Sequence, residues 1–229
     1  MPLTFNANHL PGMASEYVAW VDVMGTQVSM SRSIKITANF IFKLHIAALR
    51  ANVGGAVRIY PVMDGFYVSA PDQNQMLIFL RNVFSSVAAE FNGTPEPQHR
   101  FLIRGGLAFG PVIHGSGVGQ CAVELQNDES YRNAILLGMP MVQAHLSELL
   151  APPFGVFVHE SARVFAPTGV EPMHWIWWKW GITGQPIWDA LKVGLPAHLQ
   201  WCEERAEAIL YLPDRIEAHK KMVEQYFED

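Results

Sequence analysis

Two aspartates occupy positions where a carboxylate can do chemistry. Asp22 lies near the end of an apolar run over residues 17–23, and Asp64 precedes Gly65 at the tip of an expected hairpin. A carboxylate in apolar surroundings is costly unless its charge is compensated, and a metal ion is one such compensation. Two carboxylates at neighbouring strand ends can hold two hard cations about 3.5–4 Å apart, which clamp the attacking and leaving oxygens of a phosphoryl transfer. The pair therefore favours metal-assisted phosphoryl chemistry.

Two further residues suit a phosphate group. Arg104 lies in an otherwise apolar strand, where its guanidinium would offer a forked donor to phosphate oxygens. Gly25 follows the first strand, and a glycine there lets backbone N–H groups at the start of the next helix face phosphate oxygens. Simpler interpretations stay open for each position: Asp22 as a helix N-cap, Asp64 as a turn residue, and Arg104 as the partner of a structural carboxylate.

The elements that must position these residues follow from the hydrophobic pattern. Helical spacing predicts helices over 34–50, 72–91, 137–150 and from 213 onward. Apolar and β-branched runs predict strands over 17–23, 56–60, 65–70, 100–109, 111–115 and 154–158, with Gly110-Pro111 dividing two of them. Gly181 to Gly184 suggests a further hairpin in the Trp-rich segment 172–188. This order predicts an α+β fold, a mostly antiparallel sheet flanked by helices in a ferredoxin-like layout.

Length and composition bound the organisation and the partners. The chain has 229 residues, half of them hydrophobic, which fits a single domain over 1–229. We expect a core over about 16–160 and a C-terminal extension over 161–229 that holds the Trp-rich segment and a terminal helix. The formal net charge of −5 gives no reason to expect a nucleic-acid partner.

The N-terminus, the apolar stretches and the cysteines bear on the cellular location. The N-terminus has neither a basic start nor a long apolar run, and no apolar stretch reaches the roughly 18–20 residues of a membrane span, so direct membrane insertion is not expected. Cys121 and Cys202 have no CxxC spacing and favour a reducing, cytoplasmic compartment.

Three segments taken together resemble the catalytic domains of class III adenylyl and guanylyl cyclases. The family's Asp-hydrophobic-x-Gly-Phe-Thr stands here as residues 22–26, without the Phe, and its hairpin Gly-Asp stands as Met63-Asp64. Its Arg-hydrophobic-Gly-Ile, followed by Gly-x-Val, stands as residues 104–107 and 110–112. The segments keep the family's order, about forty residues apart, and the resemblance covers about residues 16–160. It implies the class III cyclase fold.

The resemblance also implies a site and a reaction. Asp22, Asp64 and Arg104 would be catalytic, and Asp22, Val23 and Asp64 would bind two divalent cations, Mn²⁺ or Mg²⁺. The substrate-binding residues would be Val23, Met24, Gly25, Thr26, Tyr60 and Arg104. The ribose 3′-hydroxyl of a nucleoside triphosphate would attack its own α-phosphate, with pyrophosphate leaving. Because the family builds its site between two catalytic domains, the resemblance implies a homodimer.

Tyr60 marks one departure from the family. The purine cyclases select their base partly with Lys or Glu at this position, and a phenol offers a donor, an acceptor and a stacking face without the charge. The chain in this respect resembles the pyrimidine cyclases of the bacterial anti-phage Pycsar systems, whose cyclic nucleotide activates a separate effector protein. That resemblance implies antiviral defence and favours UTP, giving cyclic UMP, over CTP. An adenylate cyclase, and Tyr60 as an ordinary strand aromatic, are the alternatives.

A second departure concerns the groups that stabilise the transition state. The family carries an Asn and, four residues on, an Arg, and Val142 and Leu146 stand at those positions here. Gln143 and His145 are the nearest polar residues, and Arg132 lies upstream. This departure favours a competing hypothesis, a catalytically inactive cyclase-like domain that binds nucleotide or a partner. Retention of both aspartates opposes it.

Overall fold

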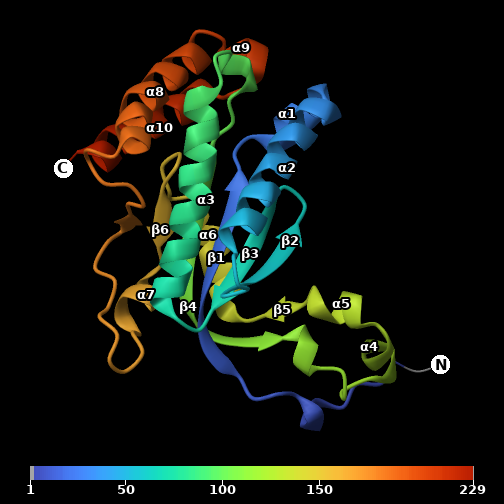
Figure 1. The fold of residues 1–229 in the computed structure, drawn as a ribbon. Coiled ribbons are helices and arrows are strands. Elements are labelled where there is room, and N and C mark those ends of the chain that lie inside the picture. Colours follow the sequence, from blue (N-terminus) through green and yellow to red (C-terminus); the bar gives the residue numbers. More distant parts are fainter. Residues whose placement is uncertain (1–2, 229) are drawn as a thin grey trace.

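The fold is built on a seven-stranded sheet, with strand order β2-β3-β1-β4-β6-β7 and β5 paired to β4 (Figure 1). The computed structural model describes residues 3–228. The strands are β1 (Ala14–Val23), β2 (Arg58–Val62), β3 (Gly65–Ala70), β4 (Ile103–His114), β5 (Leu136–Leu137), β6 (Val156–Val158) and β7 (Trp177–Trp178). All strand pairs are antiparallel except β4 with β6. The predicted α+β class with a mostly antiparallel sheet is confirmed.

Helices flank the sheet. The α-helices are α1 (Thr26–Arg32), α2 (Ile34–Ala51), α3 (Gln73–Gly93), α4 (Val123–Asn127), α5 (Glu129–Asn133), α6 (Met139–Glu148), α7 (Glu160–Val164), α8 (Pro186–Glu203), α9 (Ala206–Ile209) and α10 (Pro213–Phe227). Short 3-10 turns cover Ala7–His9, Pro97–His99 and Gly115–Gly117. The predicted helices in the regions of α2, α3, α6 and α10 are all present.

The two faces of β1 have different surroundings. Its odd-numbered residues from Tyr17 to Val23 belong to the main core, with apolar residues of α2 and α3. Its even-numbered residues from Glu16 to Asp22 lie on the opposite face, where α6 packs across β1 and β4. Figure 1 shows α2 and α3 in front of the sheet and α6 behind it. Asp22 therefore lies on the face that α6 partly covers.

Two strand predictions are wrong. Residues 100–115 do not form two strands divided at Gly110-Pro111, because β4 runs unbroken to His114. Pro111 pairs with Ser15 of β1, while β6 and β5 pair with β4 only at 105–107 and 113–114. The missing N–H of proline thus falls where β4 has no ladder on its other side, and proline is tolerated there.

The Trp-rich segment also differs from its prediction. Gly181 to Gly184 does not turn a hairpin but leads into α8, which begins at Pro186. Trp178, Trp180 and Trp188 are buried in the main core. In Figure 1, α8 lies beside α3 and α10 beside α8, in agreement with their packing. Since Pro at the first turn favours a helix start, Pro186 was the signal for α8.

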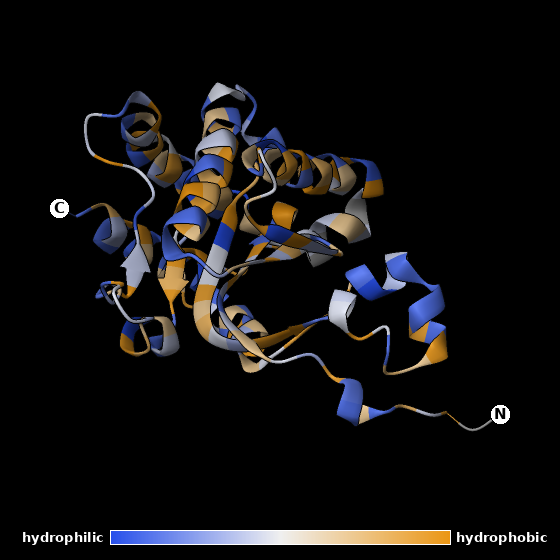
Figure 2. Ribbon diagram, turned by 60° about the horizontal axis from the view of Figure 1, so that its bottom comes forward, coloured by the Kyte–Doolittle hydropathy of each residue, from blue (hydrophilic) through white to orange (hydrophobic). Residues whose placement is uncertain are grey.

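At the other end of the sheet, the N-terminal segment runs beside α4 and α5 in both Figures 1 and 2. The amide of Asn6 donates to the carbonyl of Cys121 at 2.8 Å.

Cys121 and Cys202 are both buried free thiols. Within residues 3–228, none of the helices combines the length and hydropathy that crossing a bilayer requires. The single-domain organisation stays a prediction.

Candidate functional site

The sheet brings three of the predicted site segments together. In register, Asp22 of β1 lies opposite Gly65 of β3 on one side and Arg104 of β4 on the other. Directly opposed residues of antiparallel strands point to the same face, with Cβ atoms about 4.5–5.5 Å apart. A Cβ on Gly65 would lie 2.4 Å from the Val21 carbonyl oxygen and 2.8 Å from the Asp22 Cβ. Glycine is therefore required there because β3 passes so close to Asp22.

Asp64 lies in the β2–β3 turn beside the end of β1. The Thr26 hydroxyl donates a hydrogen bond to Asp64 Oδ2, and the Val23 amide donates to the Asp64 carbonyl oxygen at 3.4 Å. The hairpin and the β1–α1 connection are thus joined through Asp64. Met63 has φ 43° and an 85% exposed side chain. It holds a left-handed conformation that favours glycine, at the position where the cyclase pattern has glycine.

The connection from β1 to α1 supplies backbone rather than side chains. The side chain of Val23 is buried, and the Met24 amide donates to the Leu102 carbonyl oxygen at 2.8 Å. Gly25 is the N-cap of α1, with φ 75° and ψ 18°. Because Gly25 caps the helix and Asp22 belongs to β1, the alternative of Asp22 as an N-cap is wrong.

Arg104 has a partner that the sequence did not reveal. Its Nε donates to Oε1 of Glu148, the last residue of α6, and the two side chains are only 14% and 3% exposed. The alternative that Arg104 pairs with a carboxylate is thus confirmed, but that carboxylate lies at the same site. The available signal was a lone acidic residue in the otherwise apolar stretch Leu-Ser-Glu-Leu-Leu.

Gly106 sets how closely α6 approaches the sheet. A Cβ there would lie 2.0 Å from the Ala144 carbonyl oxygen and 2.7 Å from the Glu148 amide nitrogen, both backbone atoms of α6. The absence of a side chain at Gly106 is what allows Glu148 to reach Arg104.

Replacing Gly106 with alanine is therefore expected to displace α6 and to lower the free energy of unfolding by at least about 1–3 kcal/mol. Urea denaturation measures this loss. Gly93→Ala is the matched control, since nothing lies within 4 Å of a Cβ at Gly93. Equal stability of the two variants would contradict the close packing.

The electrostatics of Asp22 suit a bound cation. Burial, followed by the negative charges of Glu148 and Asp64, raises the pKa of Asp22 to about 8, and the positive charge of Arg104 opposes the shift. Asp22 Oδ1 is buried and has no hydrogen-bond partner among the described residues. A buried oxygen that lacks a partner in a negative environment fits a hard cation. Within residues 3–228, no group of three or more His, Cys, Asp or Glu side chains is arranged to hold a metal, so the candidate ligands are a pair.

The same burial predicts a stability effect. The ionised carboxyl of Asp22 is disfavoured in the fold, so its protonated form contributes stability that is fully present below pH 3.8 and is lost as the pH rises toward about 8. Asp22→Asn removes this loss, and we expect it to be more stable than the wild type at pH 8 by at least about 1.4 kcal/mol, the free energy of one pKa unit.

Urea midpoints at pH 4 and pH 8 measure this difference. Asp72→Asn is the control, because asparagine also caps α3 where Asp72 accepts from the Gln75 amide at 2.8 Å. A gap between wild type and Asp22→Asn that does not widen with pH would contradict the prediction.

Tyr60 lies on the same face of the sheet, within a hydrogen-bonded chain. Its hydroxyl lies 2.6 Å from His114 Nδ1, and His114 Nε2 lies 2.9 Å from Glu16 Oε1. Burial raises the pKa of the Tyr60 hydroxyl, and the charge of Arg58 opposes the shift. The side chain is 5% exposed. Tyr60 is therefore a neutral phenol whose hydroxyl already has a partner, and its contact with a base stays a prediction.

The α6 residues at and beside the family's transition-state positions, and Arg132 upstream of them, make contacts in different parts of the fold. Val142 and Leu146 are 50% and 59% exposed. The ring of His145 lies 5.5 Å from Trp20, edge to face. Arg132 Nη1 donates to the carbonyl oxygens of Leu125 and Gln126, within the α4–α5 region. None of these contacts involves Asp22, Asp64 or Arg104.

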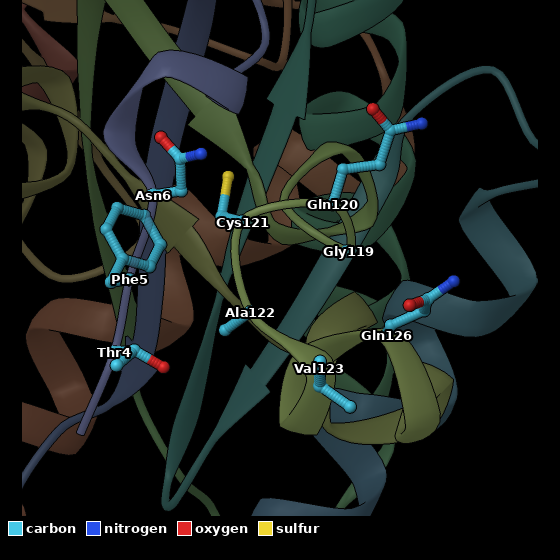
Figure 3. A pocket seen from close by; sticks show the side chains of 9 residues that line it. All are labelled: Thr4, Phe5, Asn6, Gly119, Gln120, Cys121, Ala122, Val123 and Gln126. Carbon is cyan, nitrogen blue, oxygen red and sulfur yellow. The ribbon is translucent and has the colours of Figure 1, made fainter. Parts of the chain in front are cut away.

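Two pockets lie away from the aspartates. One, of about 280 Å³, is lined by Thr4, Phe5, Asn6, Gly119, Gln120, Cys121, Ala122, Val123 and Gln126 (Figure 3). It lies between the N-terminal segment and α4, and it has no charged residue in its wall. The other, of about 360 Å³, is bounded by Ser15, Pro140, Gln143 and neighbouring residues. Neither includes Asp22, Asp64 or Arg104.

Solved structures place this architecture among known folds. The guanylyl cyclase domain of the RhoGC fusion protein from the aquatic fungus Blastocladiella emersonii aligns with a TM-score of 0.51 and 16% identity, covering 67% of this chain and 85% of that domain. The adenylate/guanylate cyclase/hydrolase from Silicibacter pomeroyi aligns with a TM-score of 0.50 and 14% identity, covering 64% of this chain and 76% of that protein. No protein-family model matches the chain, and no curated protein matches it by sequence.

The chain has the fold of a class III nucleotidyl cyclase catalytic domain. The comparisons establish the fold, because identities of 14% and 16% do not carry an activity. The register of β1, β3 and β4 places the three motif segments side by side.

Proposed function

We propose that the protein is a metal-dependent nucleotidyl cyclase that forms a 3′,5′-cyclic nucleotide and pyrophosphate. The observation that carries this proposal is that Asp22 and Arg104, on the central strands β1 and β4, lie beside the turn that holds Asp64, and that one buried oxygen of Asp22 has no hydrogen-bond partner among the described residues. The names of the structural relatives, guanylyl cyclase and adenylate/guanylate cyclase, support the same reaction class.

Each residue has a role in this proposal. Asp22 and Asp64 would hold two divalent cations, Mn²⁺ or Mg²⁺, together with the backbone of Val23. Bound there, the cations would lower the pKa of the ribose hydroxyl and neutralise phosphate charge. The Thr26 hydroxyl holds the Asp64 carboxylate in one orientation through the bond to Oδ2. Arg104 and the backbone of Gly25 would bind the triphosphate, and Met24, whose amide donates to the Leu102 carbonyl oxygen, would line the same site.

The reaction balances without a further co-reactant. The ribose 3′-oxygen forms a bond to the α-phosphorus, and the bond from that phosphorus to the bridging oxygen of the β-phosphate breaks. The hydroxyl proton leaves to solvent, and pyrophosphate departs. Arg104 and Asp22 lie opposite each other on the same face of adjacent strands, and Asp64 lies in the turn beside the end of β1, so the three can bind one triphosphate.

The substrate in this proposal is a pyrimidine triphosphate, with UTP favoured. Tyr60 supports this assignment because a neutral phenol stands where purine cyclases carry a charged residue. The product, cyclic UMP, would activate a separate effector protein in a cytoplasmic antiviral response of the Pycsar type. The two buried free thiols are compatible with that compartment.

A homodimer belongs to the same proposal. The class III cyclases that the sequence resembles build their site between two catalytic domains, so a second copy of this chain would complete the substrate site. The outer side of α6 also carries the exposed apolar residues Met139, Val142 and Leu146 at helical spacing, and the exposed Leu149 follows as its C-cap. Sedimentation in solution is expected to give twice the chain mass of 25.6 kDa.

A competition experiment tests the substrate. The protein is incubated with Mn²⁺ and equal amounts of ATP, GTP, CTP and UTP, and the cyclic products are identified by mass. Cyclic UMP as the main product supports the proposal, and cyclic CMP or cyclic AMP would replace the substrate assignment. No cyclic product would favour an inactive binding domain, the alternative that the apolar Val142 and Leu146 suggest.

A further inference from the structure

Glu148 is a charged member of the site that the cyclase pattern does not include. It is 2% exposed and lies at the C-terminal end of α6. A carboxylate is unfavourable there for two reasons: burial removes its hydration, and the helix dipole places partial negative charge at that end. The Nε–H of Arg104 is its ion-pair partner. The buried carboxylate of Glu148 is thus tolerated because it forms an ion pair with Arg104.

Asp22 is the other carboxylate within reach of Arg104. The two residues are directly opposed on β1 and β4, which brings their Cβ atoms to about 4.5–5.5 Å. An arginine released from Glu148 would pair with Asp22, because a forked guanidinium and a carboxylate form a strong charge-assisted bond. Such a pair would occupy the oxygen that is now without a partner.

Glu148 binds Arg104 through Nε, and this leaves the two terminal nitrogens of the guanidinium for other ligands. Glu148 Oε1 accepts from Nε, the nitrogen nearest the chain. The two terminal nitrogens carry the remaining four N–H groups of the fork. Arg104 is 14% exposed, so these groups are not sealed from an incoming anion.

We infer that Glu148 is a positioning residue that holds Arg104 away from Asp22 and so keeps Asp22 open to a divalent cation. The inference rests on the proposed function, since it takes Asp22 as a cation ligand and Arg104 as a phosphate ligand. Glu148 also lies against the Asp22 carboxyl, but in this inference it acts through Arg104 and would be a ligand of neither the cation nor the substrate. Gly106 contributes to the same arrangement, because the absence of a side chain there allows α6 to come close enough to β4 for Glu148 to reach Arg104.

Binding of Mn²⁺ alone, measured from the electron paramagnetic resonance signal of the free ion, tests this inference without turnover. Glu148→Asp keeps the charge but shortens the side chain by one methylene, so it no longer reaches Nε. Glu148→Gln keeps the length but is a weaker partner for a guanidinium. We expect both to weaken Mn²⁺ binding at least about tenfold, as Asp22 gains an arginine partner.

The double variant Glu148→Gln with Arg104→Gln is expected to restore Mn²⁺ binding to the wild-type level or tighter. It removes both charges of the Arg104–Glu148 ion pair together, and it leaves no guanidinium to pair with Asp22. Glu90→Asp is the matched control, a glutamate that pairs with Lys43 between α2 and α3 and is 44% exposed. This control should bind Mn²⁺ as the wild type does. Melting curves verify that each variant is folded, and Glu148→Gln serves if Glu148→Asp is not.

Three results would overturn the inference. Wild-type affinity in Glu148→Asp would mean that only the charge of Glu148 matters. A double variant as weak as the single variants would mean that Glu148 is itself a ligand or only a packing residue. A wild-type chain that binds no Mn²⁺ would contradict the inference and the cation site together. Mn²⁺ binding that follows the expected pattern, without a cyclic product from any triphosphate, would contradict the proposed function alone.

Discussion

Asp64→Asn is expected to reduce cyclic nucleotide formation by about 10³-fold or more. A bound cation contributes several kcal/mol of charge stabilisation in a transition state, and each 1.36 kcal/mol is a factor of ten in rate. The amide retains the size of Asp64, and its oxygen can still accept the Thr26 hydroxyl bond. The variant should therefore fold as the wild type does and lose activity through the missing charge.

The measurement is the rate of cyclic product with saturating UTP and Mn²⁺, beside a melting curve. Asp72→Asn makes the same chemical change at an exposed cap of α3 and should keep full activity. Full activity in Asp64→Asn would show that Asp64 is only a turn residue, and the cation pair would then be wrong.

Arg104→Ala should have the largest effect on stability, a loss of about 3–5 kcal/mol in the free energy of unfolding. Without the guanidinium, the Glu148 carboxylate at 2% exposure has lost its ion-pair partner beside Asp22. The triphosphate would also lose the guanidinium that is proposed to bind it, so product formation should disappear. Urea denaturation and the product assay measure the two losses separately.

Arg205→Ala is the matched control, because the Arg205–Glu204 pair is exposed and such pairs contribute about 0–1 kcal/mol. Replacing Arg104 and Glu148 together by leucine should recover most of the stability, since an apolar pair of similar volume can replace a buried ion pair. That double variant should remain without activity. A recovery of both stability and activity would show that Arg104 has only a structural role.

The sequence predicted the strands that carry Asp22 and Arg104, and the hairpin with Asp64 in its turn is where it was expected. These predictions succeeded because alternating or apolar runs and the Asp-Gly turn are local signals. The wrong division of β4 at Gly110-Pro111 came from reading proline as a breaker. Proline breaks a strand only where its N–H is needed, and the ladders on both sides of a strand decide that.

Glu148 was missed for a different reason. Its contact with Arg104 joins a helix end to a strand 44 residues earlier in the chain, and no local pattern connects the two. The contact depends on the backbone of α6 passing directly over Gly106. Helix packing of this closeness is a tertiary property, so a lone acidic residue in an apolar helix was the only clue available.

We propose above that Asp22 and Asp64 form the cation site of a nucleotidyl cyclase. Its most direct test is to incubate the purified protein with Mn²⁺ and each ribonucleoside triphosphate in turn, and to quantify cyclic nucleotide and pyrophosphate by mass. We expect equal amounts of a 3′,5′-cyclic nucleotide and pyrophosphate, most from UTP, and neither product from Asp64→Asn. No cyclic nucleotide from any of the four, or an open-chain monophosphate in its place, would contradict it.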